Sequence, residues 1–277
     1  MIDLKKSLNL AQKLALEAGK FLLATQSKIK IKKFKNEFDL DVATNADLGA
    51  EKIIINGIRK YYPDHAICSE ERGQIESRSD YLWYIDPLDG TKEFIKNIPI
   101  YTVNISLEYK SKLLVGVSYN PNTNYLFASA KNFGTLLNGK TVRVSQEGNL
   151  NKAFIYGHLP NYKMSFKRTR EIWKILAEIT QKCNRLRTSS ADINSLALVA
   201  MGACEASILL NEPDWGPKWW DEAAGILMVR EAGGIVTDQE GNSIINRDLS
   251  KSLIASNGKI HKQLIDFINN STCHSEH

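Results

Sequence analysis

WYIDPLDGTKEF, residues 83–94, holds two aspartates three positions apart among proline and glycine. It opens on an aromatic, apolar run typical of a buried strand, so Asp86 is expected where this strand emerges. Pro87 cannot continue the sheet ladder, because it has no backbone N–H group to donate. Asp89 follows at the tip, where Gly90 lets the backbone turn tightly. The stretch therefore predicts two carboxylates held close together at the end of a strand.

Two carboxylates this close repel each other unless a positive charge lies between them. A divalent cation fits this requirement, and Mg²⁺ in particular takes oxygen ligands and shares them with substrate phosphate. Thr91 is expected to cap a short helix through KEFI, and the free backbone N–H groups at a helix start suit an anion such as phosphate. Asp-Pro and Asp-Gly are also ordinary turn dipeptides, so a purely structural turn is the alternative. The combination of features favours half of a metal and phosphate site.

Acidic residues at other expected strand and helix ends offer further ligands for such a site. They are Glu70 and Glu71 in CSEERG, Asp47 in TNAD and Asp221 in WWDEAAG. Each has a structural alternative: Glu70 and Glu71 as a solvated pair, and the two aspartates as helix-start residues favoured by the helix dipole. Asp47 begins a helix expected at about residues 46–62. Together these positions favour one site assembled from distant parts of the chain.

The rest of the chain indicates two halves. From about residue 101, β-rich runs separated by turn residues predict an antiparallel meander. In the second half, strand-like and helical segments alternate, which implies a layered α/β arrangement. The polar stretch SQEGNLNK marks a boundary between them. We therefore expect an α+β domain at 1–150 with most metal ligands, and an α/β domain at 151–277 that supplies Asp221 and leaving-group contacts.

Composition and charge exclude several classes of protein. The 277 residues include 36 basic and 31 acidic ones, and a net charge of +5 is too mild to argue for a nucleic-acid polymer as partner. No basic stripe interleaved with aromatic residues is evident at this stage. The four cysteines are scattered, which fits a reducing cytoplasm. No apolar run is long enough to span a bilayer, so no membrane partner is expected.

In its ordered motifs the sequence resembles the inositol monophosphatase superfamily of metal-dependent, lithium-sensitive phosphatases. SEE, DPLDGT and WDEAAGILMVREAGG occur in that order, with TNAD upstream, and the resemblance covers nearly the whole chain. It implies a layered αβαβα sandwich and Mg²⁺ as cofactor, with two or three ions per site. It also implies a phosphomonoesterase that acts on a small phosphate ester, and a homodimer is compatible with it.

The resemblance assigns roles to individual residues. It implies metal ligands at Glu70, Asp86, Asp89 and Asp221 and at the main-chain carbonyl of Leu88. It implies that Glu70, or Thr91 paired with Asp47, activates the attacking water. It implies substrate contacts at Asp89, Gly90, Thr91, Ser190, Ala191, Asp192 and Asp221.

The substrate stays open at this stage. DGTKEFI is most similar to the 3′(2′),5′-bisphosphate nucleotidases, whereas NIPIY is closer to inositol monophosphatases, and these are the two leading alternatives. Asp192 resembles a residue of histidinol-phosphate phosphatases, although it also suits a helix cap. Fructose-1,6-bisphosphate phosphatase is a further alternative. A metal and phosphate sensor without turnover is the alternative outside enzymes.

Two other stretches invite a functional interpretation. NEPDWGPK, residues 211–218, is either a lid over the leaving group, with Glu212, Asp214, Trp215 and Lys218, or a surface loop. GTLLNGKT, residues 134–141, matches the pattern of a nucleotide-binding P-loop. That motif requires a helix after the loop, and β-branched VRVS follows instead. We therefore expect an Asn-Gly hairpin there.

Overall fold

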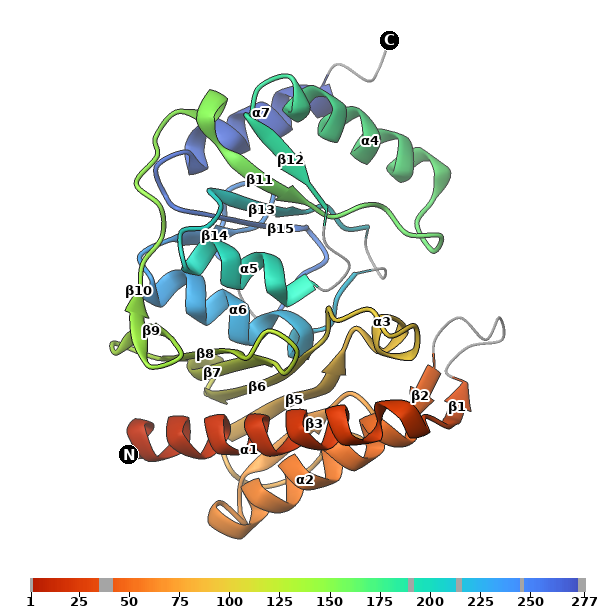
Figure 1. Ribbon diagram of the computed structural model, residues 1–277. Coiled ribbons are helices and arrows are strands. Elements are labelled where there is room, and N and C mark those ends of the chain that lie inside the picture. The colour runs from red at the N-terminus through yellow and green to blue at the C-terminus, as the bar shows by residue number, and fades with distance from the viewer. Residues whose placement is uncertain (1, 35–41, 189–191, 213–215, 245–246, 274–277) are drawn as a thin grey trace. The chain divides into compact units, whose positions relative to one another are not determined.

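The computed structural model describes residues 2–34, 42–188, 192–212, 216–244 and 247–273 (Figure 1). Within these ranges the side chains of residues 31–34, 42, 192–194 and 271–273 are outside the description. The chain divides into two compact units: Met1–Thr141 with Trp220–Met228, and Val142–Trp219 with Val229–His277. The expected boundary at residue 150 placed Asp221 in the second domain, and this division differs from it at that residue of the site. The segment carrying Asp221 groups with the first unit, and the domain boundary itself stays a prediction.

The first unit is built on an eight-stranded sheet with the strand order β10-β9-β8-β7-β6-β5-β3-β4. Consecutive strands from β5 to β9 pair antiparallel, which is the expected meander, and β3 pairs parallel with β5. The strands are β3 (Ala66–Ser69), β4 (Gly73–Ile75), β5 (Tyr81–Asp89), β6 (Thr102–Tyr109), β7 (Lys112–Asn120), β8 (Tyr125–Ala130), β9 (Gly134–Leu137) and β10 (Lys140–Val142). A separate ribbon pairs β1 (Ile31–Phe34) with β2 (Val42–Thr44).

Two long helices, α1 (Leu4–Thr25) and α2 (Asn45–Tyr61), cover one face of this sheet (Figure 1). The apolar stripe of α1 packs with the buried residues of the strands in one core. Gly19 allows this close approach, because a Cβ atom there would lie 2.5 Å from the ring of Tyr119 on β7. The short 3₁₀ helix η1 (Gln26–Lys28) follows α1, and α3 (Thr91–Ile95) follows β5.

The opposite face of the same sheet is polar along β6. Its apolar residues alternate with Thr102, Asn104, Ser106 and Glu108, none of which is more than 2% exposed. The part of α6 (Trp219–Glu231) that belongs to the first unit covers this face. Gly116 lies opposite Ser106, and a Cβ atom there would lie 2.9 Å from the carbonyl oxygen of Ala224. The start of α6 is therefore held directly against the sheet.

The second unit contains a five-stranded mixed sheet in the order β12-β11-β13-β15-β14. Strands β11, β12 and β13 run parallel, whereas β15 is antiparallel to both β13 and β14. The strands are β11 (Phe154–Gly157), β12 (Arg185–Arg187), β13 (Ala206–Leu209), β14 (Ile235–Thr237) and β15 (Leu253–Ser256). The helices are η2 (Leu150–Lys152), α4 (Phe166–Thr180), α5 (Asp192–Ala200) and α7 (His261–Cys273). Helices α4 and α7 lie side by side and share one apolar core with the strands (Figure 1).

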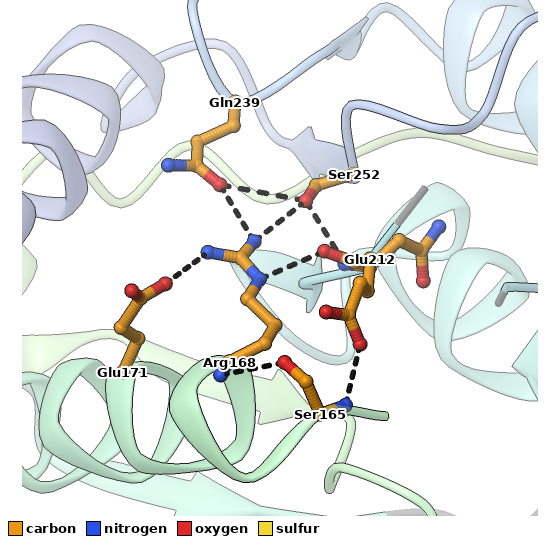
Figure 2. Close-up of polar contacts among 7 residues, drawn as sticks. Ser165, Arg168, Glu171, Glu212, Gln239 and Ser252 are labelled. Carbon is orange, nitrogen blue, oxygen red and sulfur yellow. Dashed lines mark hydrogen bonds and ion pairs between the residues drawn. The ribbon is translucent and has the colours of Figure 1, made fainter. Parts of the chain in front are cut away.

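Arg168 on α4 is the centre of a polar network in the second unit (Figure 2). Its guanidinium donates to the backbone oxygen of Asn211 at 2.8 Å and to the side-chain oxygen of Gln239 at 3.1 Å. It also pairs with Glu171 at 3.2 Å. Its side chain is only 16% exposed, so these hydrogen bonds are largely shielded from water. Arg168 thereby ties α4 to the segment after β13.

We expect Arg168→Ala to lower the free energy of unfolding by about 2–3 kcal/mol, because it removes several charge-assisted hydrogen bonds from a sheltered place. Arg170→Ala changes an exposed arginine on the same helix and should shift stability by less than about 0.5 kcal/mol. Urea unfolding of both variants measures the difference. Equal midpoints for the two would contradict a structural role for Arg168.

The P-loop-like stretch forms the expected hairpin. Strands β9 and β10 are neighbours in the sheet, and no helix follows β10 before residue 150. Asn138 and Gly139 between them have φ values of 49° and 80°, the left-handed pair of a type I′ turn. Among the described residues, no helix is long and apolar enough to cross a membrane.

Candidate metal centre

A β-bulge in β5 places the two aspartates of the signature stretch on one face of the sheet. Asp86 lies opposite Asn104 on β6, and Asp89 lies opposite Thr102, so three steps along β5 match two along β6. Residues three apart in a regular strand point to opposite faces, and the extra residue of a bulge cancels this difference. Pro87 has no partner on β6, as expected, but β5 continues past it and pairing resumes at Asp89.

Glu70 joins this face from the neighbouring parallel strand. Ser69 pairs with Ile85, and the backbone N–H of Glu70 donates to the carbonyl of Ile85 at 3.1 Å. Glu70 therefore lies beside Asp86, close enough for its negative charge to raise the pKa of Asp86. Glu71, in contrast, lies in the turn that follows β3 and is only partly buried.

Asp221 reaches the same place from the first turn of α6. It precedes Ala224 by three residues, so both lie on the helix face that packs on the sheet near Gly116. Burial raises the pKa of Asp86 well above its usual range, and the negative charges of Glu70, Asp89 and Asp221 raise it further. Four acidic side chains from three separate parts of the sequence thus act on one another electrostatically within the first unit.

The donor set of these residues fits a hard divalent cation. All four side chains offer carboxylate oxygen, the ligand that Mg²⁺ prefers, and a bound cation would offset their mutual repulsion. In the described part of the chain, no group of three or more His, Cys, Asp or Glu side chains has the spacing to hold a metal ion alone. Mg²⁺ ordinarily keeps several waters and takes substrate oxygens in addition to a few carboxylates. The cluster therefore fits Mg²⁺ with outside ligands better than a closed metal site.

Thr91 and Asp47 form the hydroxyl–carboxylate pair that the resemblance implied. The hydroxyl of Thr91 lies 3.0 Å from Asp47 Oδ1 and 3.1 Å from the carbonyl oxygen of Leu88. The other carboxylate oxygen of Asp47 accepts from the backbone and hydroxyl of Thr44, in a capping box at the start of α2. Burial raises the pKa of Asp47, although its hydrogen bonds oppose that shift. Asp47 is thus fixed on both sides, and its catalytic role stays a prediction.

Gly90 is required by the backbone between the bulge and α3. It has φ +89°, and a Cβ atom there would lie 2.8 Å from the carbonyl oxygen of Ile100. Gly90, and not Thr91 as expected, caps α3, and it makes no side-chain hydrogen bond to the backbone N–H groups of the first turn. Phosphate binding by Gly90 and Thr91 stays a prediction.

Glu51 is a residue of this site that the sequence analysis missed. It is fully buried on α2 and accepts hydrogen bonds from the hydroxyl of Ser69 and from the backbone and guanidinium of Arg72. These contacts fix the turn that carries Glu70. A signal was present in the sequence, since Glu51 follows Asp47 by four residues and shares its helix face.

Some predicted substrate contacts lie outside the described residues. These are Ser190, Ala191 and the side chain of Asp192, as well as Asp214 and Trp215 of the expected lid. Glu212 from the same stretch is described, and it accepts a hydrogen bond of 2.6 Å from the backbone of Ser165 before α4. That contact is a structural one, and the lid interpretation stays a prediction.

Comparison with known proteins identifies relatives across almost the whole chain. The sequence model of the inositol monophosphatase family matches residues 3–273. The Nus factor SuhB of Escherichia coli strain K12 is 34% identical over 259 residues, 93% of this chain and 94% of that relative.

Solved structures give the same result. The extragenic suppressor protein suhB of Bartonella henselae superimposes with a TM-score of 0.85 at 31% identity, and covers 95% of this chain and 98% of its own. The inositol monophosphatase of Anabaena (Nostoc) sp. PCC 7120 gives 0.81 at 27% identity, with 97% of each chain covered. The predicted α/β sandwich fold is thereby confirmed. This chain belongs to the inositol monophosphatase family.

Proposed function

We propose that this protein is a Mg²⁺-dependent phosphomonoesterase that hydrolyses a small phosphate ester by activating a water molecule. The observation that carries the proposal is the coexistence of two parts in the first unit. A carboxylate cluster suited to a divalent cation lies around Asp86. Thr91, two residues after Asp89, forms a partly buried hydroxyl–carboxylate pair with Asp47. A protein that only binds metal and phosphate does not need the hydroxyl–carboxylate pair of Thr91 and Asp47.

The cation would be held by Glu70, Asp86, Asp89 and Asp221. Mg²⁺ bound there would act as a Lewis acid toward phosphate oxygen and would lower the pKa of bound water. The carbonyl of Leu88 accepts from Thr91, which leaves its second lone pair as a further oxygen ligand.

Thr91 and Asp47 are proposed to take the proton of the attacking water. Thr91 passes its own hydroxyl proton to Asp47 Oδ1 as its oxygen accepts one from water, so the pair acts as one general base. Thr44 holds the other oxygen of Asp47 and so keeps the acceptor in place. Glu70 is the alternative base, and Glu51 positions it through the turn at Arg72.

The substrate proposed first is an inositol monophosphate or a 3′(2′),5′-bisphosphate nucleotide. The Anabaena relative is named an inositol monophosphatase, which supports the first of these. The bacterial relatives named Nus factor carry a name that does not specify hydrolysis, so turnover itself has to be measured. Histidinol phosphate and fructose 1,6-bisphosphate remain the alternatives within the superfamily. The proposed site lies in a cytoplasmic protein, alone or as a homodimer.

Phosphate release from these four esters tests the proposal, with Mg²⁺, with a chelator, and with Mg²⁺ plus lithium. We expect turnover of at least one ester that depends on Mg²⁺. If thermal stability rises with Mg²⁺ and inorganic phosphate while no ester is hydrolysed, the sensor alternative replaces the enzyme. If neither effect occurs, both assignments of the site are wrong.

A further inference from the structure

The positive charge of this protein is concentrated in one segment of the second unit. Residues 162–187 contain eight Lys and Arg against two Glu, so the rest of the chain has 28 basic and 29 acidic residues. The whole net charge of +5 therefore arises from this segment. It includes α4 and β12, both in the same unit. The mild average charge of the chain hides this local excess.

Aromatic rings are exposed among these charges. Phe166 is 77% exposed, Tyr162 57% and Trp173 50%, although large apolar side chains are usually covered. The apolar face of α4, with Ile172, Ile175, Leu176 and Ile179, is already buried in the core of the unit. Phe166, Arg170 and Trp173 follow one another at helical spacing and form a separate stripe on its outer face.

Cations lie over the rings in this region. The guanidinium of Arg170 lies 5.9 Å from the ring centre of Phe166, and the ammonium of Lys163 lies 5.9 Å from that of Tyr162. A surface hollow of about 530 Å³ lies next to the stripe. It is lined by Phe166, Lys167, Arg170, Glu171 and Lys174. We call the set Tyr162, Lys163, Phe166, Lys167, Arg170, Trp173 and Lys174 the α4 surface.

We propose that the α4 surface binds single-stranded nucleic acid. Such sites combine basic side chains that follow the phosphate backbone with aromatic rings on which bases stack. Phe166 and Trp173 would provide the rings, and Lys167, Arg170 and Lys174 the charges. The hollow beside Phe166 has both kinds of contact in one place, as one nucleotide requires. This function is independent of the proposed phosphatase site and lies in the other unit.

Two other kinds of polyanion fit the α4 surface less well. An anionic membrane would bind the continuous apolar face of an amphipathic helix, and the apolar face of α4 is buried. An acidic protein segment would pair with the cations but would not need three exposed rings. Arg168 is the cation of α4 that is used internally, in the network of Figure 2, so it is not part of this surface.

Fluorescence anisotropy of the full chain with labelled 12-nucleotide oligo-U, at 50 and 200 mM KCl, tests the proposal. We expect binding that weakens steeply with salt. Phe166→Ala with Trp173→Ala should weaken it at least about 10-fold at both salt concentrations, since each stack is lost without loss of charge. Lys167→Gln, Arg170→Gln and Lys174→Gln together should weaken it and also reduce its dependence on salt.

The matched control changes Lys20, Lys52 and Lys112 to Gln, the same charge change on exposed positions of the first unit, and should leave binding within about twofold of wild type. All variants should keep the wild-type Tm.

Failure of the wild type to bind oligo-U overturns the proposal, as does an equal loss in the control. If Phe166→Ala with Trp173→Ala binds oligo-U as tightly as the wild type, the rings play no part and the α4 surface is a general polyanion site. Tighter, ring-dependent binding to anionic phospholipid vesicles or to poly-glutamate than to oligo-U would assign it to those partners instead.

Discussion

Asp86→Asn should abolish Mg²⁺-dependent phosphate release while leaving the metal-free protein at least as stable as the wild type. Activity should fall by at least about 100-fold, because even residues that only support a metal ligand cost 10–100-fold when they are changed. Asparagine keeps the side-chain oxygen that accepts from the backbone N–H of Leu88 at 3.0 Å. It replaces a buried carboxyl group whose ionised form is disfavoured by burial and by the charges of Glu70, Asp89 and Asp221. The Tm without metal should therefore rise, and its increase on addition of Mg²⁺ should disappear.

Asp80→Asn is the matched control for this result. Asp80 is exposed at the start of β5, where it pairs with Lys110 at 3.4 Å, and the same chemical change there should alter neither activity nor Tm. The measurements are phosphate release and thermal unfolding with and without Mg²⁺. An Asp86→Asn protein that still hydrolyses its ester at the wild-type rate would remove Asp86 from the metal centre.

Thr91→Val should lower kcat by about 10²–10⁴-fold with little change in KM, which is the range expected for loss of a general base. Valine fills nearly the same volume but has no hydroxyl, so Asp47 Oδ1 and the carbonyl of Leu88 both lose their donor. Thr91→Ser keeps the hydroxyl and should keep most of the activity. Steady-state kinetics of the two variants separate the hydroxyl from the shape of the side chain.

Thr141→Val provides a control at an exposed threonine in β10, just after the Asn-Gly turn, and its kcat should equal that of the wild type. If Thr91→Val instead raises KM and spares kcat, Thr91 holds phosphate through its side chain and Glu70 becomes the better candidate for the base. If both kinetic constants are unchanged, the pair with Asp47 only stabilises the start of α3.

Part of this site could be predicted from sequence because the residues that mark turns and strand ends act locally. The dipeptides around Asp86 and Asp89 mark a strand end, and spacing alone shows that both carboxylates are near each other. That they share one face depends on the bulge at Pro87, which follows from pairing with β6 and is not visible in β5 itself. For the same reason the continuation of β5 past Pro87 was not predicted.

Other features were missed because they depend on tertiary context. In the sequence Glu51 is indistinguishable from any other helix glutamate, because its role depends on its tertiary contacts with Ser69 and Arg72. The α4 surface was overlooked because net charge was averaged over the whole sequence. The P-loop-like hairpin, in contrast, was recognised correctly, since the Asn-Gly turn and the β-branched run after it are both local signals.

The grouping of Trp220–Met228 with the first 141 residues has a consequence for biosynthesis. A ribosome releases the eight-stranded sheet long before it makes the helix that covers the polar side of β6. Until then Asn104, Ser106 and Glu108 face water, and the acidic cluster lacks its last member. The nascent N-terminal portion can thus acquire its α1 and α2 layer early, whereas the face that carries the acidic cluster is completed only after residue 228 has been translated.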